Sequence, residues 1–88
     1  MSDEQAITSE ILRQVEARGR DKSICPSEVA RSLAPEAWRP LMGAVRRAAI
    51  RLSQAGRLDI LRKGRVVAGV EIRGVIRLRA RSGPGESA

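Results

Sequence analysis

The 88-residue chain contains no histidine, tyrosine or phenylalanine, one cysteine and one tryptophan. The sequence therefore offers no nucleophile–base pair and no cluster of metal ligands, and it has no paired carboxylates at a predicted cleft. A single cysteine also cannot form an internal disulfide. We expect a protein that is not an enzyme and that binds no metal and no small-molecule cofactor.

The chain also lacks a long apolar run: no stretch approaches the ~20 residues that span a bilayer. Its first residues, MSDEQAITSE, are acidic and lack the apolar core of a signal peptide. These absences predict a cytoplasmic protein that does not associate with membranes.

Because Trp38 is the only aromatic residue, the core must be aliphatic. A chain of this length forms one small domain, which buries roughly 60% of the surface that the unfolded chain exposes. The last residues, RSGPGESA, are rich in Gly, Pro and Ser. We expect a domain over residues 1–80 and a disordered tail over residues 81–88.

The charge is distributed unevenly along the chain, whose net charge is +7. Residues 1–37 carry five basic and seven acidic side chains, whereas residues 38–88 carry twelve basic and three acidic ones. This asymmetry favours a polyanionic partner at one end of the molecule. Fifteen of the seventeen basic residues are arginine, which pairs well with phosphate and guanine. A high-GC genome would also raise the arginine content, but it does not explain the asymmetry.

Two helices are predicted in the N-terminal half. Apolar residues at helical spacing predict a helix over residues 3–18, which Gly19 ends. A second helix is predicted over residues 26–33, since Pro26 suits a first helical position. Cys25 precedes it, and we interpret it as a small half-buried residue rather than a reactive thiol. Ile24 is a candidate for a short strand.

A third helix is predicted over residues 40–55, between Pro40 and Gly56. One side is apolar and should be buried: Trp38, Leu41, Met42, Val45, Ala49 and Leu52. Trp38 is better interpreted as a plug between the second and third helices than as a platform on which bases stack.

The other side of the third helix is the candidate DNA-binding face: Arg39, Gly43, Arg46, Arg47, Ile50, Arg51 and Gln54. A solvated helix surface is the alternative, but such a surface normally mixes charges, and this helix has no acidic residue. Inserted in a major groove, the face would send some guanidinium groups to bases and others to phosphates.

Alternating residues predict two antiparallel strands, at about 58–62 and 75–79. The long segment between them carries Lys63, Arg65 and Arg73, which would follow the phosphate backbone as a wing. The wing also holds four apolar residues that could extend the strands, pack against the body or bind a partner: Val66, Val67, Val70 and Ile72.

These elements predict an α+β fold, a winged helix-turn-helix of three helices followed by a two-stranded antiparallel β-hairpin wing, with the strand near Ile24 as an optional third. The segment SEVARSLAPEAWRPLMGAVRRAAIRLSQAGRLDILRKGRVV, with RGVIRLR beyond it, resembles a bacterial family of small winged-helix proteins catalogued as a domain of unknown function. The resemblance covers about residues 5–79. It implies the winged-helix fold and no activity.

The leading hypothesis is that the protein binds double-stranded DNA as a transcriptional regulator or accessory factor. The alternative is a protein-interaction module, either an adaptor or a homodimer, because a winged helix can also dock a protein. RNA binding ranks third, since the chain lacks aromatic residues on which unpaired bases could stack.

Overall fold

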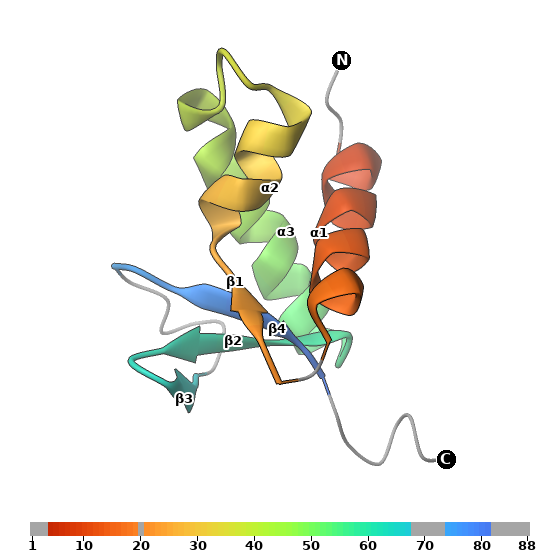
Figure 1. Ribbon diagram of the computed structural model, residues 1–88, viewed down its shortest axis with the longest axis vertical. Coiled ribbons are helices and arrows are strands. Elements are labelled where there is room, and N and C mark those ends of the chain that lie inside the picture. The colour runs from red at the N-terminus through yellow and green to blue at the C-terminus, as the bar shows by residue number, and fades with distance from the viewer. Residues whose placement is uncertain (1–3, 20, 68–73, 82–88) are drawn as a thin grey trace.

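The computed structural model describes residues 4–19, 21–67 and 74–81. Figure 1 shows a layer of three helices standing on a small sheet. The elements in chain order are α1 (Glu4–Arg18), β1 (Ser23–Ile24), α2 (Pro26–Leu33), the 3-10 turn η1 (Arg39–Leu41), α3 (Met42–Gln54), β2 (Leu58–Arg62), β3 (Arg65–Val66) and β4 (Arg77–Ala80).

The first two helices lie where the sequence predicts them. In α2, Pro26 occupies the first turn, and the backbone N–H of Cys25 donates to Oε2 of Glu28 at 2.9 Å. This hydrogen bond satisfies a donor that the start of a helix otherwise leaves unpaired. Cys25 is half-buried, as expected.

The third predicted helix is divided at its start. Residues 39–41 form a 3-10 turn, in which the N–H of Leu41 donates to the carbonyl of Trp38 at 2.9 Å, and α3 begins at Met42. Its end is a Schellman motif: Arg57 N donates to Leu52 O, and Gly56 N donates to Ser53 O. Gly56 has a φ of +78°, which a residue with a side chain rarely adopts.

The four strands form one antiparallel sheet in the order β1-β4-β2-β3. β4 lies between β1 and β2, so that Leu78 pairs with both Ile24 and Ile60. All three side chains are fully buried and belong to the same core cluster as the buried residues of the three helices. The strand at Ile24 is therefore real, and the hairpin becomes part of a larger sheet.

The wing segment does not begin as an open loop. The chain reverses at Lys63 and Gly64, with φ values of 54° and 82°, and returns as β3 beside the end of β2. Positive φ at both central residues matches the right-handed twist of a hairpin. The predicted wing residues Val70, Ile72 and Arg73 lie outside the described residues, as does the tail after Arg81.

The core is aliphatic, as predicted, and draws on all three helices and three strands. Its buried members are Ile7, Ile11, Val15, Ile24, Val29, Ala30, Val45, Ala48, Ala49, Leu52, Leu58, Ile60, Ile76 and Leu78. Trp38 is half-buried at the edge of this cluster.

The α+β architecture is consistent with a winged-helix-like fold, with the β2–β3 hairpin as part of the wing. Within the described ranges, no helix is long and apolar enough to cross a bilayer.

A carboxylate joins α1 to α2. Glu10 accepts hydrogen bonds from Arg13 and Gln14 of its own helix and from the Ser32 hydroxyl of α2 at 2.9 Å. The bond from Arg13 contributes most to lowering the pKa of Glu10 from 4.5 to about 2; Gln14 and Ser32 lower it further, and burial opposes them. The folded protein therefore favours the charged form.

Glu10→Gln should lower the free energy of unfolding at pH 7 by about 1 kcal/mol or more. Because folding depresses this pKa, the stabilisation from the charged Glu10 carboxylate is complete above about pH 4.5 and is lost as the pH falls toward about 2. Urea denaturation across this range should show a weaker pH dependence for Glu10→Gln than for the parent. Glu16→Gln, an exposed change in the same helix, is the control. Identical pH profiles for Glu10→Gln and the parent would contradict this account.

Candidate nucleic-acid interface

The helix α3 is two-sided. Its buried side is formed by Val45, Ala48, Ala49 and Leu52. Four of the predicted contact residues are exposed on the opposite side: Gly43, Arg47, Arg51 and Gln54. Within the described ranges, the side chains of Arg47 and Gln54 have no hydrogen-bond or ionic partner, whereas Arg51 forms an ion pair with Glu4 of α1.

Two other predicted residues of α3 are less available than the sequence suggests. Ile50 is half-buried and packs against the core, because an apolar side chain gains by leaving water where a neighbouring surface exists. Arg46 is also half-buried, and its Nη1 donates to the carbonyl of Gly74 at 3.0 Å. Arg46 therefore braces α3 against the segment that leads into β4.

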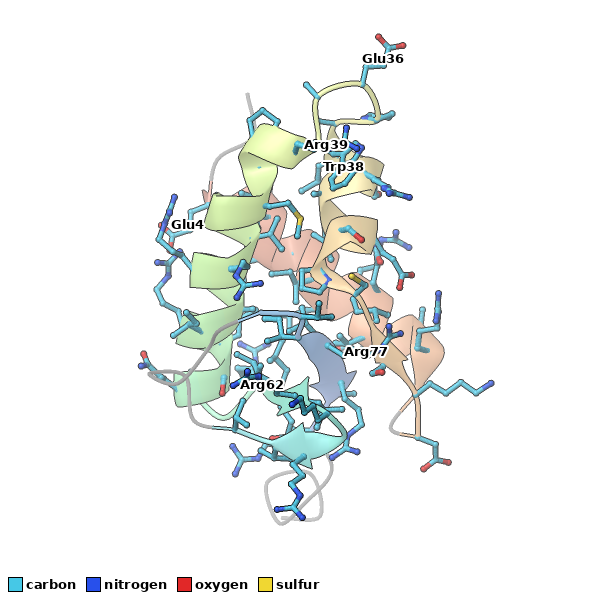
Figure 2. All side chains as sticks on the ribbon, turned by 90° about the vertical axis from the view of Figure 1, so that its left-hand side faces the viewer. Glu4, Glu36, Trp38, Arg39, Arg62 and Arg77 are labelled. Carbon is cyan, nitrogen blue, oxygen red and sulfur yellow. The ribbon has the colours of Figure 1, made fainter. Side chains whose placement is uncertain are left out.

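Arg39 lies in η1, one turn before α3. Its guanidinium carbon lies 4.7 Å from the centroid of the Trp38 ring, and the side chain is exposed. Figure 2 shows Arg39 and Trp38 together near one end of α3, while Arg62 and Arg77 lie toward its other end.

The wing is taken here as β2, β3 and β4 with the segments that connect them, and its described residues include four exposed cations. Lys63 and Arg65 were predicted, and the predicted Arg73 lies outside the described residues. The structure adds Arg62 and Arg77, which the pairing Leu61↔Arg77 brings to adjacent strands. Arg77 is fixed by hydrogen bonds from Nε to the Ser23 hydroxyl at 2.6 Å and from Nη2 to the Ser23 carbonyl at 3.0 Å. The sequence contained a signal for Arg77: residues alternate between the two faces of a strand, so an inward-pointing Leu78 in VIRLR predicts that Arg77 lies on the outer face.

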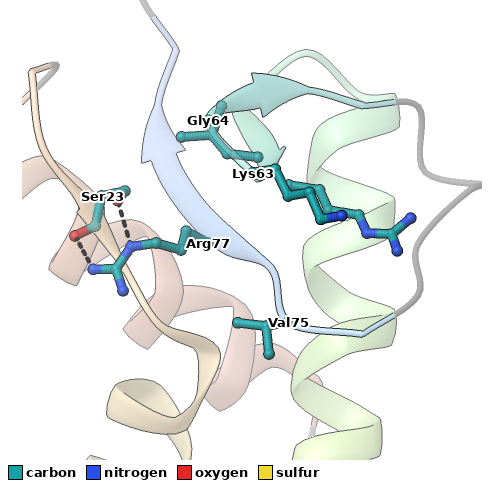
Figure 3. Close-up of a pocket in the computed structure, with 7 residues that line it drawn as sticks. Ser23, Lys63, Gly64, Val75 and Arg77 are labelled. Carbon is teal, nitrogen blue, oxygen red and sulfur yellow. Dashed lines mark hydrogen bonds between the residues drawn. The ribbon is translucent and has the colours of Figure 1, made fainter.

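An apolar-lined cavity of about 470 Å³ lies at the base of the wing. Figure 3 shows Ser23 and Arg77 on one side and Lys63 and Gly64 on the other, with Val75 below. Leu61 and Arg62 complete its lining. Val75 is 81% exposed and Val66 is 57% exposed, whereas Val67 packs against the core. The wing valines are thus divided between the surface and the body.

The described acidic residues lie almost entirely on the N-terminal half: Glu4, Glu10, Glu16, Asp21, Glu28 and Glu36. The remaining one, Asp59 in β2, lies 3.7 Å from the guanidinium of Arg79. α3 contains no acidic residue, and Glu4 of α1, which lies beside it, is paired with Arg51. The described part of α3 and the wing therefore has no unpaired carboxylate. The charge asymmetry of the sequence is therefore also a separation in space.

The brace between α3 and the wing can be tested directly. Arg46→Ala removes the donor to the Gly74 carbonyl, and we expect the hydrogen-bonded backbone amides of β4, which follows this segment, to exchange about fivefold faster with deuterium. Arg47→Ala, an exposed neighbour without a partner in the described chain, should leave that exchange unchanged. Equal exchange in both variants and the parent would show that Arg46 does not hold this segment.

A comparison with protein families finds one family model that matches residues 4–81, which run from α1 through β4. The family is described as "Protein of unknown function (DUF3253)". No curated protein matches the chain. The match therefore covers the candidate interface but assigns no role to it.

Proposed function

The chain belongs to this family of proteins of unknown function, and we propose that it binds double-stranded DNA through α3 and the wing. In this proposal it is a bacterial, cytoplasmic winged helix-turn-helix protein that acts as a transcriptional regulator or an accessory factor. The proposal rests mainly on one observation: the exposed side of α3 and the wing carry cations and no unpaired carboxylate among the described residues.

The dimensions of α3 suit a major groove. A helix with side chains is about 10–12 Å in diameter, and the groove is about 12 Å wide. Gly43 presents no side chain on the exposed face, so the helix backbone can approach the duplex there once the guanidinium of Arg47, which lies over this glycine, turns toward the DNA. Arg47 and Gln54 are the groups best placed to reach base edges, since neither is engaged elsewhere in the described chain.

The wing supplies contacts of a different kind. Lys63 and Arg65 are exposed beside the tight turn, and cations of this type neutralise phosphates without reading sequence. Arg46 has a supporting role in this proposal, because its bond to Gly74 fixes the wing relative to α3. The fixed angle lets the helix and the wing engage one duplex together.

A salt titration of binding to a mixed-sequence duplex tests the proposal. Arg47→Ala/Arg65→Ala removes one helix cation and one wing cation. Because Arg65 is the phosphate contact of this pair, the plot of log affinity against log salt should become less steep by about 0.9, while the loss of Arg47 lowers the affinity further. We also expect affinity at low salt to fall roughly 10- to 100-fold, measured by anisotropy of a labelled duplex.

The matched control is Arg57→Ala/Arg81→Ala, which removes the same charge. Both of these arginines are exposed and line a cavity with Leu12 and Glu16 of α1, away from the proposed face. The control should retain the parent's slope. If the two double variants lose affinity equally, the attraction depends on net charge alone and the proposed face is wrong. If the parent does not bind the duplex at low salt, the proposal is wrong.

Exposed Val66 and Val75 favour a second candidate function, self-association or docking of another protein through the wing. Isolated apolar residues are common on surfaces, but these two accompany the apolar cavity that Leu61 and Val75 line. For self-association, the expected occupant is the same wing of a second copy, related by two-fold symmetry.

Light scattering after size-exclusion chromatography tests that second function. A homodimer predicts that the parent's mass doubles as concentration rises and that Val66→Ser/Val75→Ser stays monomeric. Ala37→Ser/Ala55→Ser changes two exposed alanines outside the wing and should behave as the parent does. A parent that remains monomeric at every concentration would exclude the homodimer.

A further inference from the structure

The guanidinium groups of two arginines, Arg31 and Arg39, lie over the ring of Trp38. The guanidinium carbon of Arg31 lies 4.4 Å from the ring centroid, and that of Arg39 lies 4.7 Å from it. Arg31 belongs to α2 and Arg39 to η1, so the cluster joins the two helical segments of the helix-turn-helix. Because both guanidinium carbons lie close to the same ring centroid, they are separated from each other by at most the sum of these two distances.

Contact with the ring leaves the hydrogen-bonding capacity of both arginines free. A guanidinium that stacks on an aromatic ring uses its flat face, and its N–H donors remain available at the edge. Neither Arg31 nor Arg39 donates to another group within the described chain, and neither does the indole N–H of Trp38. The cluster thus presents unused donors from three side chains.

Among the described residues, no carboxylate forms an ion pair with Arg31 or Arg39. Glu28 lies three residues before Arg31, but its carboxylate is engaged by Arg18 and by the backbone N–H of Cys25. Glu36 lies three residues before Arg39 and forms no ion pair with either arginine within the described chain. Figure 2 shows it at the tip of the connecting loop, directed away from Trp38. Two cations near one ring repel each other, and an anion that bonds to both would offset that repulsion.

We infer that Arg31, Trp38 and Arg39 form a phosphate-binding site for the backbone of a nucleic acid. This inference rests on the proposed function and adds to it a contact from α2. Stacking reduces the rotamer freedom that a guanidinium must lose on binding, so the site is partly preorganised. It positions the duplex and does not read its sequence.

The position of the site on the molecule supports a backbone contact. The cluster lies where η1 leads into α3, and Arg62 and Arg77 of the wing lie toward the other end of that helix (Figure 2). Thirteen residues of α3 extend about 20 Å, so the cluster and these two wing cations are separated by roughly the length of the helix. With α3 lying in the groove, the cluster meets the phosphate backbone beside one end of the helix, and the wing meets it beside the other end.

The lone tryptophan makes the site directly observable, because all indole fluorescence comes from Trp38. We expect an added mixed-sequence duplex to reduce the quenching of this fluorescence by acrylamide at least twofold. Anisotropy of a labelled duplex, measured in parallel as a function of salt, gives the affinity and the number of phosphates engaged.

Three variants separate a phosphate site from a merely structural stack. Arg31→Ala should weaken duplex binding roughly tenfold at low salt and reduce the salt slope by about 0.9. Arg31→Lys retains the charge but loses the planar group, so it should retain the slope and lose part of the affinity. Arg57→Ala removes an equal charge elsewhere and should change neither quantity.

The inference fails if the parent binds the duplex while the quenching of Trp38 stays unchanged and Arg31→Ala retains the parent's affinity and slope. In that case the stack only covers the ring, and DNA binding by α3 and the wing survives if Arg47→Ala/Arg65→Ala is still impaired. A parent that binds no duplex overturns both proposals together. Should Arg31→Ala unfold, the comparison of Arg31→Lys with Arg57→Ala decides the question.

Discussion

The apolar side of α3 is buried against α1, α2 and β2, and this burial sets how α3 and the wing are oriented. Val45, Ala48, Ala49 and Leu52 exclude water from the contacts of α3 with α1, α2 and β2. Small alanines allow the helices to approach closely, and no polar side chain is buried among the described residues. Because this side must face inward, the arginine-rich side must face solvent. The Schellman motif at Gly56 then directs the chain into β2 and so places the wing beside the same helix.

The separation of charge follows from that geometry. α1 and α2 carry most of the described acidic residues, which are engaged in part by local contacts such as Arg18 with Glu28 at 2.8 Å. The half of the chain that forms α3 and the wing carries the excess of arginine. A protein that needed only solubility would gain from mixed charges on every face. The distribution therefore supports electrostatic attraction to a polyanion, with orientation set by the uneven field.

Local patterns in the sequence were sufficient to predict most elements, whereas tertiary contacts decided the details of the site. Helical spacing located α1 and α2, and alternation located β2 to the residue. The partners of Arg46 and Ile50 could not be predicted, because Gly74 and the core residues meet α3 through tertiary packing and not through local sequence. The same holds for Arg31: nothing in α2 alone indicates that its guanidinium meets Trp38. The Lys63–Gly64 turn was hidden because lysine seldom adopts a positive φ.

If α3 and the wing engage duplex DNA as one continuous surface, as we propose, both should respond together when DNA is added. This response can be followed by NMR while the ¹⁵N-labelled protein is titrated with a short duplex. We expect the amide signals of Gly43, Arg47 and Gln54 in α3 and of Arg65 in the wing to shift together, while the signals of Arg13 and Glu16 on α1 remain in place. Shifts concentrated on α1, or no shifts at low salt, would show that this surface does not bind DNA.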